Sequence, residues 1–289
     1  MIYIGVEAAN SFVKVKSINK ESIYLNTLKR VTSQREVIGG SLTKCEQGHA
    51  YLLEGESDAY LIGLPDGKSS TSRDTDRYSS DFYKRQMLFA ISQHVGNGDD
   101  VIVGTGLPAN HYENEVAIQS IKSLIGPHAV YIDGLVKMFN INEVKITLQP
   151  IGMISQLIFN QDGQLNAGGE EIAEGKKLII DIGWGTTDIA SMEGMELIKY
   201  DGIDTAMLDA YLYAIEHLQG KYNELKQGMK TPFELDEIYR NNKALKVRQR
   251  EYDDFRDFIN DAYKHTADEI VATIKSLGYT FSDYDYVIF

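Results

Sequence analysis

Two short segments of the sequence place a carboxylate at the end of an apolar strand, directly before a turn of small residues. The stronger one follows Leu-Ile-Ile and reads Asp-Ile-Gly-Trp-Gly-Thr-Thr-Asp from Asp181 to Asp188; the weaker one runs from Glu7 to Lys14. Backbone amides in a tight turn form an anion-binding nest, and glycine lets the backbone approach an anion closely. A carboxylate cannot contact a phosphate directly, so its natural role is to hold a hydrated Mg²⁺. The chemistry indicated is the binding of phosphates.

For each segment the alternative is an ordinary β-hairpin with a small-residue turn, since such turns commonly join strands. The complete pattern from Asp181 to Asp188 favours phosphate binding over this alternative. The alternative is stronger for the first segment, where Ala8 and Ala9 occupy the turn. Lys14, on the following strand, is either a cation for phosphate or a solvent-facing residue of an alternating strand.

The elements that would position these turns are short strands alternating with helices. β-Branched and aromatic runs predict strands over 2–6, 12–18, 22–31, 50–54, 59–62, 100–105, 129–132, 141–148, 177–182, 186–192, 196–200 and 286–289. Helical spacing of apolar residues predicts helices over 81–95, 110–124, 150–160, 205–217, 233–240 and 250–277. The polar stretch 63–80 is expected to be a mobile surface segment.

The length of 289 residues suits two domains, and 43% hydrophobic residues indicate a globular protein. The net charge of -13, without a long basic run, argues against direct binding to DNA or to an anionic membrane. One cysteine (Cys45), no signal peptide and only short apolar runs predict a cytoplasmic protein without a transmembrane helix. The six histidines show no metal-ligand spacing, so we expect no metal cage of protein side chains.

A series of motifs resembles the superfamily of actin, heat-shock chaperone ATPases and sugar kinases, and most closely the bacterial plasmid-segregation actins of the ParM type. Residues 181–188 match the second phosphate motif of that superfamily. Residues 101–112 resemble the Val-x-Gly-Leu-Pro-x-x-x-Tyr segment of ParM-like proteins, and residues 148–152 resemble the first connecting motif. The motifs occur in the expected order, and the resemblance covers most of the chain.

The resemblance implies an α/β, actin-like (ribonuclease H-like) fold, duplicated into two domains with a nucleotide cleft between them. Residues 1–148 would form the first domain, with a small inserted subdomain around 31–80. Residues 149–289 would form the second domain, with a helical subdomain around 204–275. The family also carries an adenosine-binding Gly-Gly turn after a late strand. Because 286–289 look like the start of that strand, we expect that a C-terminal part is missing.

The resemblance also implies roles for individual residues. Glu7, where the family usually carries Asp, and Asp181 would hold Mg²⁺ through water. Gln149 would position the attacking water; its alternative is a helix-entry residue that bonds to the backbone. The catalytic residues expected are Gln149, Asp181 and Glu7, and the phosphate-binding residues expected are Asn10, Ser11, Phe12, Lys14, Gly183, Trp184, Gly185, Thr186 and Thr187.

The function that the resemblance implies is an ATPase, or a GTPase, that assembles into a filament and segregates plasmid DNA through a ParR-type adaptor. The acidic charge agrees with indirect contact to the DNA. A small-molecule kinase of the same superfamily and a non-polymerising chaperone-like ATPase are the alternatives. Sedimentation with Mg-ATP would separate the filament-forming protein from both.

Overall fold

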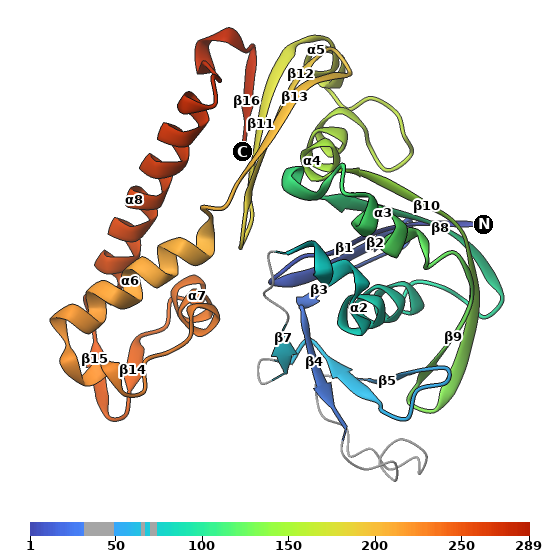
Figure 1. Ribbon diagram of the computed structural model, residues 1–289, viewed down its shortest axis with the longest axis horizontal. Coiled ribbons are helices and arrows are strands. Elements are labelled where there is room, and N and C mark those ends of the chain that lie inside the picture. The colour runs from blue at the N-terminus through green and yellow to red at the C-terminus, as the bar shows by residue number, and fades with distance from the viewer. Residues whose placement is uncertain (32–48, 65–66, 70–73) are drawn as a thin grey trace. The chain divides into compact units, whose positions relative to one another are not determined.

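The computed structural model describes residues 1–31, 49–64, 67–69 and 74–289, which form two compact units, 1–167 and 168–289 (Figure 1). Each unit has its own sheet and core. The expected domain boundary after Leu148 falls at the start of a helix within the first unit and remains a prediction. The predicted inserted subdomain and the predicted mobile segment fall partly outside the described residues, at 32–48, 65–66 and 70–73.

The first unit is built on a mixed sheet whose order, over the described residues, is β3-β2-β1-β8-β10-β9-β5-β6-β4-β7. Its central strands β1, β8 and β10 run parallel, and the other pairings are antiparallel. The strands are β1 Ile2–Ala8, β2 Phe12–Ser17, β3 Lys20–Leu25, β4 Thr27–Arg30, β5 Ala50–Leu53, β6 Tyr60–Ile62, β7 Lys68–Ser69, β8 Asp99–Leu107, β9 Gly126–Ile132 and β10 Leu135–Leu148.

The helices of the first unit are α2 Asp81–Ser92, α3 Glu115–Lys122 and α4 Gln149–Ile158, with 3₁₀ turns at Thr75–Ser79 and Ala109–His111. Helix α2 begins at the side chain of Ser80, which accepts a hydrogen bond from the Tyr83 amide at 3.2 Å. Its buried residues, among them Met87 and Phe89, pack on β1 and β2 and form the core of the unit. This core fixes the parallel strands whose ends carry the first turn.

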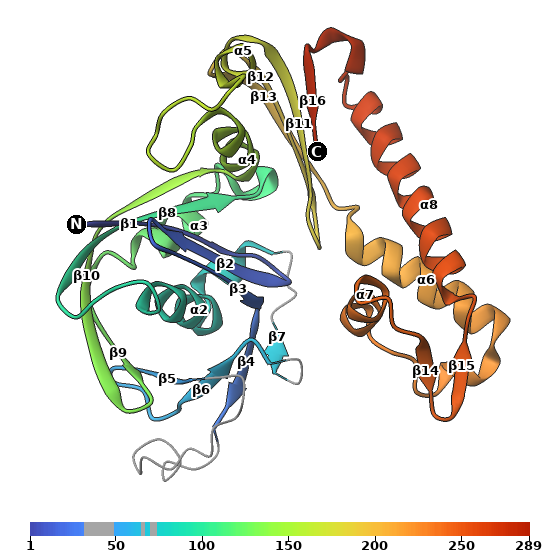
Figure 2. The same ribbon diagram turned by 180° about the vertical axis from the view of Figure 1, so that it is seen from behind.

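The second unit contains a four-stranded sheet of order β13-β12-β11-β16, followed by a helical part with a small hairpin. Its elements are α5 Gly169–Glu174, β11 Lys176–Ile182, β12 Thr187–Glu193, β13 Glu196–Ile203, α6 Met207–Lys221, α7 Pro232–Arg240, β14 Leu245–Val247, β15 Arg250–Tyr252, α8 Phe255–Ser276 and β16 Tyr286–Ile288. Figure 2 shows α6 and α8 packed side by side. No helix of the described residues is long and apolar enough to cross a membrane.

Two expectations about elements were wrong where tertiary contacts override the local pattern. The helix predicted over 250–277 begins at Phe255, because 250–252 pair with β14 as a hairpin strand. Arg248 takes a positive φ of 57° in the hairpin turn, and Tyr252 is buried against the helices. The single strand predicted over 22–31 divides at Asn26, whose backbone amide donates to the Ser11 carbonyl at 2.8 Å.

A second helix is also shorter than predicted. The segment 110–124 begins with the 3₁₀ turn Ala109–His111, and α3 starts only at Glu115. Asn114 explains this start, because its side-chain oxygen accepts a hydrogen bond from the Ala117 amide at 2.9 Å. Such an N-cap satisfies one of the amides that a helix leaves unpaired at its beginning.

One buried histidine makes the stability of the first unit depend on pH. The ring of His94, just after α2, lies 3.0 Å from the Ser17 hydroxyl through Nδ1 and 3.2 Å from the Ser22 hydroxyl through Nε2. Burial, with a smaller contribution from the charges of Lys20 and Lys137, lowers the pKa of His94 to about 4. The folded protein therefore holds this ring neutral.

We expect the protein to lose stability as the pH falls from about 6.5 to about 4, because the unfolded chain binds a proton at His94 over this range and the folded chain does not. The free energy of unfolding should fall by about 2 kcal/mol. This is less than the full pKa shift of His94 would give, because solvent screens the charges of the lysines. Urea unfolding at pH 7 and at pH 4.5 measures it. His94→Gln should reduce the difference, whereas His217→Gln, at an exposed site on α6, should keep it. Equal pH dependence in all three proteins would contradict this assignment.

Candidate functional site

The turn between β11 and β12 is closed by a backbone hydrogen bond. Asp181 and Asp188 stand opposite each other in the ladder, and the Gly183 amide donates to the Thr186 carbonyl at 2.9 Å. A Cβ on residue 183 would come within 3.0 Å of that same carbonyl oxygen. A side chain here would crowd that carbonyl, so glycine suits this position, and the carboxylate-glycine pattern of the sequence forms the tight turn predicted for 181–188.

The amides and the carbonyls of this turn are used differently. The carbonyls of Gly183 and Trp184 accept hydrogen bonds from the first two amides of α6, those of Met207 at 3.3 Å and Leu208 at 2.8 Å. Within the described part of the chain, the consecutive amides 184–186 donate no hydrogen bond to another residue. Backbone donors normally find a partner. Three adjacent donors on a fixed turn are therefore suited to an anion.

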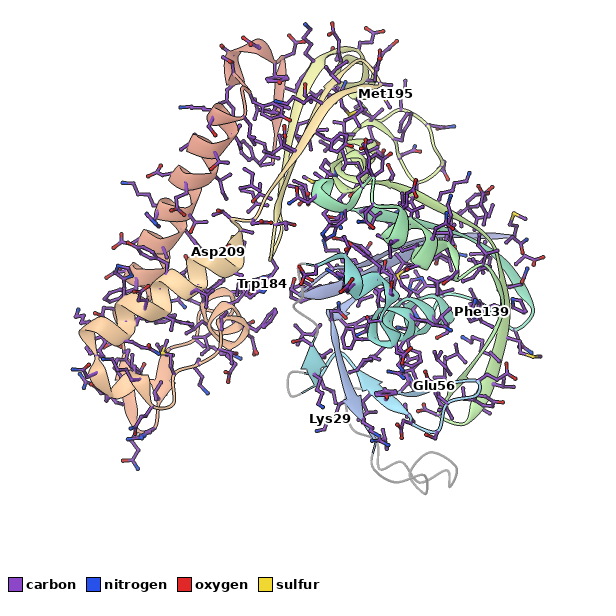
Figure 3. All side chains as sticks on the ribbon, viewed as in Figure 1. Lys29, Glu56, Phe139, Trp184, Met195 and Asp209 are labelled. Carbon is purple, nitrogen blue, oxygen red and sulfur yellow. The ribbon has the colours of Figure 1, made fainter. Side chains whose placement is uncertain are left out.

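Side chains of the same turn fix it to the rest of the second unit. The buried Thr187 hydroxyl donates to the Thr205 carbonyl at 2.7 Å, so it serves the fold. The Thr186 hydroxyl lies 3.5 Å from a carboxylate oxygen of the buried Asp188. Trp184 points into the helical part of the unit, as Figure 3 shows. The phosphate contacts predicted for these residues would therefore be made by their backbone groups.

The first turn, between β1 and β2, carries an ion pair. Glu7 and Lys14 are cross-strand neighbours, and Oε2 of Glu7 lies 2.9 Å from Nζ of Lys14. The Ala9 amide donates to the Phe12 carbonyl at 3.0 Å and closes the turn. Glu7 therefore holds the partly exposed Lys14 ammonium at the turn, where the sequence predicted a cation for phosphate.

Two residues distant in the sequence hold the oxygen atoms of the first turn. Arg77 donates to the Ala8 carbonyl at 2.5 Å and also to the side-chain oxygen of Asn10. Asn26 donates to the carbonyl of Ser11 through its backbone and to the carbonyl of Ala9 through its side chain. The amides of residues 10 and 11 bond to no other residue among those described. As in the second turn, the oxygens are held and amides remain available.

Neither Arg77 nor Asn26 was predicted from the sequence to contact the first turn. Arg77 lies in the 3₁₀ turn Thr75–Ser79 and its guanidinium sits over the rings of Tyr78 and Tyr83. Burial raises the pKa of Tyr83 to about 12, so that ring is neutral and the Arg77 charge is left for the turn. Both residues act from a distance along the chain, and the sequence contains no local pattern that pairs them with residues 8–11.

Gln149 lies at the same sheet edge as the first turn. It follows β10 directly and opens α4, and β10 runs parallel to β8 with Thr147 opposite Gly106. Strand β1 also runs parallel to β8, paired from Ile2 to Gly5, so the carboxyl end of β1 points in the same direction as that of β10. Carboxyl ends of parallel strands are where ligands bind in open α/β sheets. The first unit thus gathers Glu7, Lys14 and Gln149 at one edge.

A neighbouring glycine makes room for Gln149. A Cβ on Gly106 would lie 2.7 Å from Cγ of Gln149 and 3.3 Å from its Cα. The Gln149 amide group makes no hydrogen bond to another described residue. This arrangement favours a side chain that is positioned for a ligand over a helix-entry residue that bonds to the backbone.

The donor atoms suit an anion whose metal is bound through water. Each unit offers a carboxylate near a strand end, Glu7 on β1 and Asp181 on β11, beside a turn with available amides. Among the described residues there is no group of three or more His, Cys, Asp and Glu side chains that could hold a metal by itself. A carboxylate beside such a turn suits a hydrated Mg²⁺ that arrives with a phosphate.

Comparison with solved structures identifies the fold. An apo ParM protein, psk41 ParM, matches at 20% identity with a TM-score of 0.69, over 99% of this chain and 84% of that one. The ADP complex of Ta0583, an archaeal actin homolog, matches at 17% identity with a TM-score of 0.72, over 100% of this chain and 86% of that one. ParM of a 15-stranded filament from Clostridium botulinum matches at 14% identity with a TM-score of 0.71, over 99% of this chain and 87% of that one. The chain is an actin-fold protein, which confirms the predicted fold class.

The sequence supports a closer assignment. The family model described as "Actin like proteins N terminal domain" matches residues 10–152. The resemblance to actin-like proteins seen in the motifs is therefore confirmed, and the match covers residues 10–152. No curated protein matches the chain at a significant level.

Proposed function

We propose that the protein is a cytoplasmic, nucleotide-dependent actin-like ATPase that assembles into filaments. The observation that carries the proposal is the construction shared by the two turns, 9–12 and 183–186. In both, carbonyl oxygens are held by the protein while consecutive amides remain as donors. Two anion-binding turns of this kind, each beside a carboxylate, suit the phosphates of a nucleotide.

The side chains divide the work as follows. The amides of residues 10 and 11 and of 184–186 bind phosphate oxygens, and Lys14, held by Glu7, adds positive charge. Glu7 and Asp181 hold the water shell of Mg²⁺, which neutralises phosphate charge when it is bound. Gln149 orients the attacking water; a glutamine is not a base at neutral pH but positions a water by hydrogen bonding. ATP is the proposed nucleotide, with GTP as the other triphosphate.

Self-association is proposed from the relatives. ParM of Clostridium botulinum forms the 15-stranded filament named above, and a protein that repeats one head-to-tail contact assembles in this way. The net charge of -13 makes direct binding to DNA unfavourable. We therefore propose that a ParR-type adaptor joins the filament to plasmid DNA during segregation.

Assembly should require a nucleoside triphosphate and reverse after hydrolysis, because nucleotide shifts an equilibrium only by its differential affinity for the assembling state. Light scattering and sedimentation with ATP, GTP, ADP and a non-hydrolysable ATP analogue test this. We expect a critical concentration at least about tenfold higher with ADP than with the analogue, a difference of about 1.4 kcal/mol per subunit.

Moderate salt should aid assembly, because subunits of charge -13 repel one another and salt screens this repulsion. A chain that binds triphosphate yet forms no polymer at any salt concentration would reject the filament. Transfer of phosphate to an added sugar in place of water would instead identify a small-molecule kinase.

A further inference from the structure

The second turn is joined to the helical part of its unit by an aromatic stack. Trp184, the only tryptophan of the chain, is 8% exposed. Its ring lies nearly flat on Phe233 of α7, with centroids 4.3 Å apart and planes 14° apart, and also stacks on Tyr211 of α6 at 5.6 Å. Figure 3 shows Trp184 at the end of the β11–β12 hairpin next to α6 and α7. One residue of the predicted phosphate turn is thus a core residue of the helical part.

The backbone repeats this connection. The carbonyls of Gly183 and Trp184 accept the first two amides of α6, and the Asp209 carboxylate accepts from the Ala206 amide at 2.8 Å. The beginning of α6 is therefore fixed to the turn on one side and by its own first residues on the other. A ligand that moves the turn must move α6 with it or break two hydrogen bonds.

Helices α6, α7 and α8 are in turn held together by a buried polar group. The Tyr211 hydroxyl donates to Asp236 of α7 at 2.7 Å and lies 2.5 Å from the Tyr263 hydroxyl of α8. Burial, with the hydrogen bonds to Tyr263 and Asp236, raises the pKa of Tyr211, so its hydroxyl stays protonated and remains a donor. Asp236 also accepts from Arg240 at 2.8 Å. These hydrogen bonds join the three helices to one another.

The indole of Trp184 is the unsatisfied part of this assembly. Its Nε1–H is buried and has no hydrogen-bond partner among the described residues. An unsatisfied buried donor carries a cost that a second arrangement with a partner would remove.

We propose that Trp184 is a positioning residue that couples phosphate binding at the amides of 184–186 to the position of the α6–α7–α8 helices through its stack on Phe233. The coupling rests on the proposed nucleotide function. In this proposal Trp184 transmits a change at the turn to the three helices. Phosphate binding at the turn therefore changes the environment of the indole and sets whether the helices adopt the assembling arrangement.

The first test uses the single tryptophan as its own probe. Trp184 emission and its quenching by acrylamide are measured on the full chain with and without Mg²⁺ and a non-hydrolysable ATP analogue, with binding followed separately by equilibrium dialysis. We expect the quenching constant to change by about twofold on binding. An unchanged emission and quenching constant with the analogue bound would overturn the coupling. If the analogue and its GTP counterpart do not bind, the proposed function fails and the coupling fails with it.

The second test removes the stack and keeps the turn. Phe233→Leu should bind the analogue within about threefold of wild type, lose the Trp184 response and raise the critical concentration of assembly about tenfold. Phe258→Leu, in α8 beside the same core but outside the stack, is the matched control and should assemble as wild type. Phe233→Tyr keeps an aromatic ring and should therefore keep the Trp184 response that Phe233→Leu loses. Wild-type assembly by Phe233→Leu would overturn the coupling alone; should Phe233→Leu fail to fold, the wild-type quenching measurement decides.

Discussion

Replacing Asp181 by asparagine should lower nucleotide hydrolysis by about 100-fold or more and raise the Mg²⁺ concentration needed for activity. The residue stands at the end of β11, opposite Asp188 and directly before the turn of residues 183–186. Asparagine keeps the shape of the side chain and removes its charge. A metal contributes several kcal/mol to charge stabilisation, and each 1.36 kcal/mol is tenfold in rate, so losing its carboxylate has a large effect.

The measurement is release of inorganic phosphate as a function of Mg²⁺ concentration, with circular dichroism to show that the fold is kept. Asp201→Asn is the matched control, because it removes the same charge from β13 of the same sheet, where Asp201 accepts a hydrogen bond from Tyr279 at 2.7 Å. This control should hydrolyse nucleotide at the wild-type rate. Hydrolysis at the normal rate by Asp181→Asn would end the assignment of Asp181 to the metal.

The two turns differ in how far their local sequence predicts their structure. Residues 181–188 carry strand, turn and strand within one short segment, and the close contact that favours glycine at position 183 involves only Thr186. Local sequence therefore suffices to predict the second turn. The first turn has alanines in place of glycines, and it is held by Arg77 and Asn26 from elsewhere in the chain. No pattern within 7–14 could predict those contacts.

The same difference explains the errors in the elements. The apolar spacing of α8 at Phe255, Ile259, Ala262, Ile270 and Ile274 was predicted, and all five side chains are buried. The hairpin before it was missed, because its strands are only three residues each and their pairing depends on burial against the helices. Short strands carry little periodicity, so tertiary packing decides their structure.

The backbone and the side chain of Trp184 belong to different parts of the second unit. Its position in the glycine-rich turn predicted a phosphate contact, and the structure gives its ring to the core of the helices and leaves its amide in the turn. A sequence pattern describes the backbone of such a turn and is silent on where the side chain packs. The aromatic stack could not be predicted, because Phe233 and Tyr211 have no fixed spacing from the turn.

Replacing Gly106 by alanine should slow hydrolysis about 10-fold to 100-fold and leave nucleotide binding and assembly intact. The new Cβ would lie 2.7 Å from Cγ of Gln149, closer than side chains allow, so Gln149 must move. A displacement of about 1 Å in a positioning group costs about 100-fold in rate. Because Gln149 is proposed to orient water and not to bind nucleotide, the loss should fall on kcat and spare KM.

Gly104→Ala provides a matched control on the same strand, since a Cβ at Gly104 would meet no atom within 4 Å. This variant should hydrolyse nucleotide as the wild type does. Gln149→Ala should lose activity as Gly106→Ala does, and combining the two should add little, because both remove the same positioned group. Equal rates for Gly104→Ala and Gly106→Ala would show that the position of Gln149 is immaterial to hydrolysis. Loss of nucleotide binding in a folded Gln149→Ala protein would reassign the residue to binding, since a side chain that only orients water makes no contribution to the affinity for nucleotide.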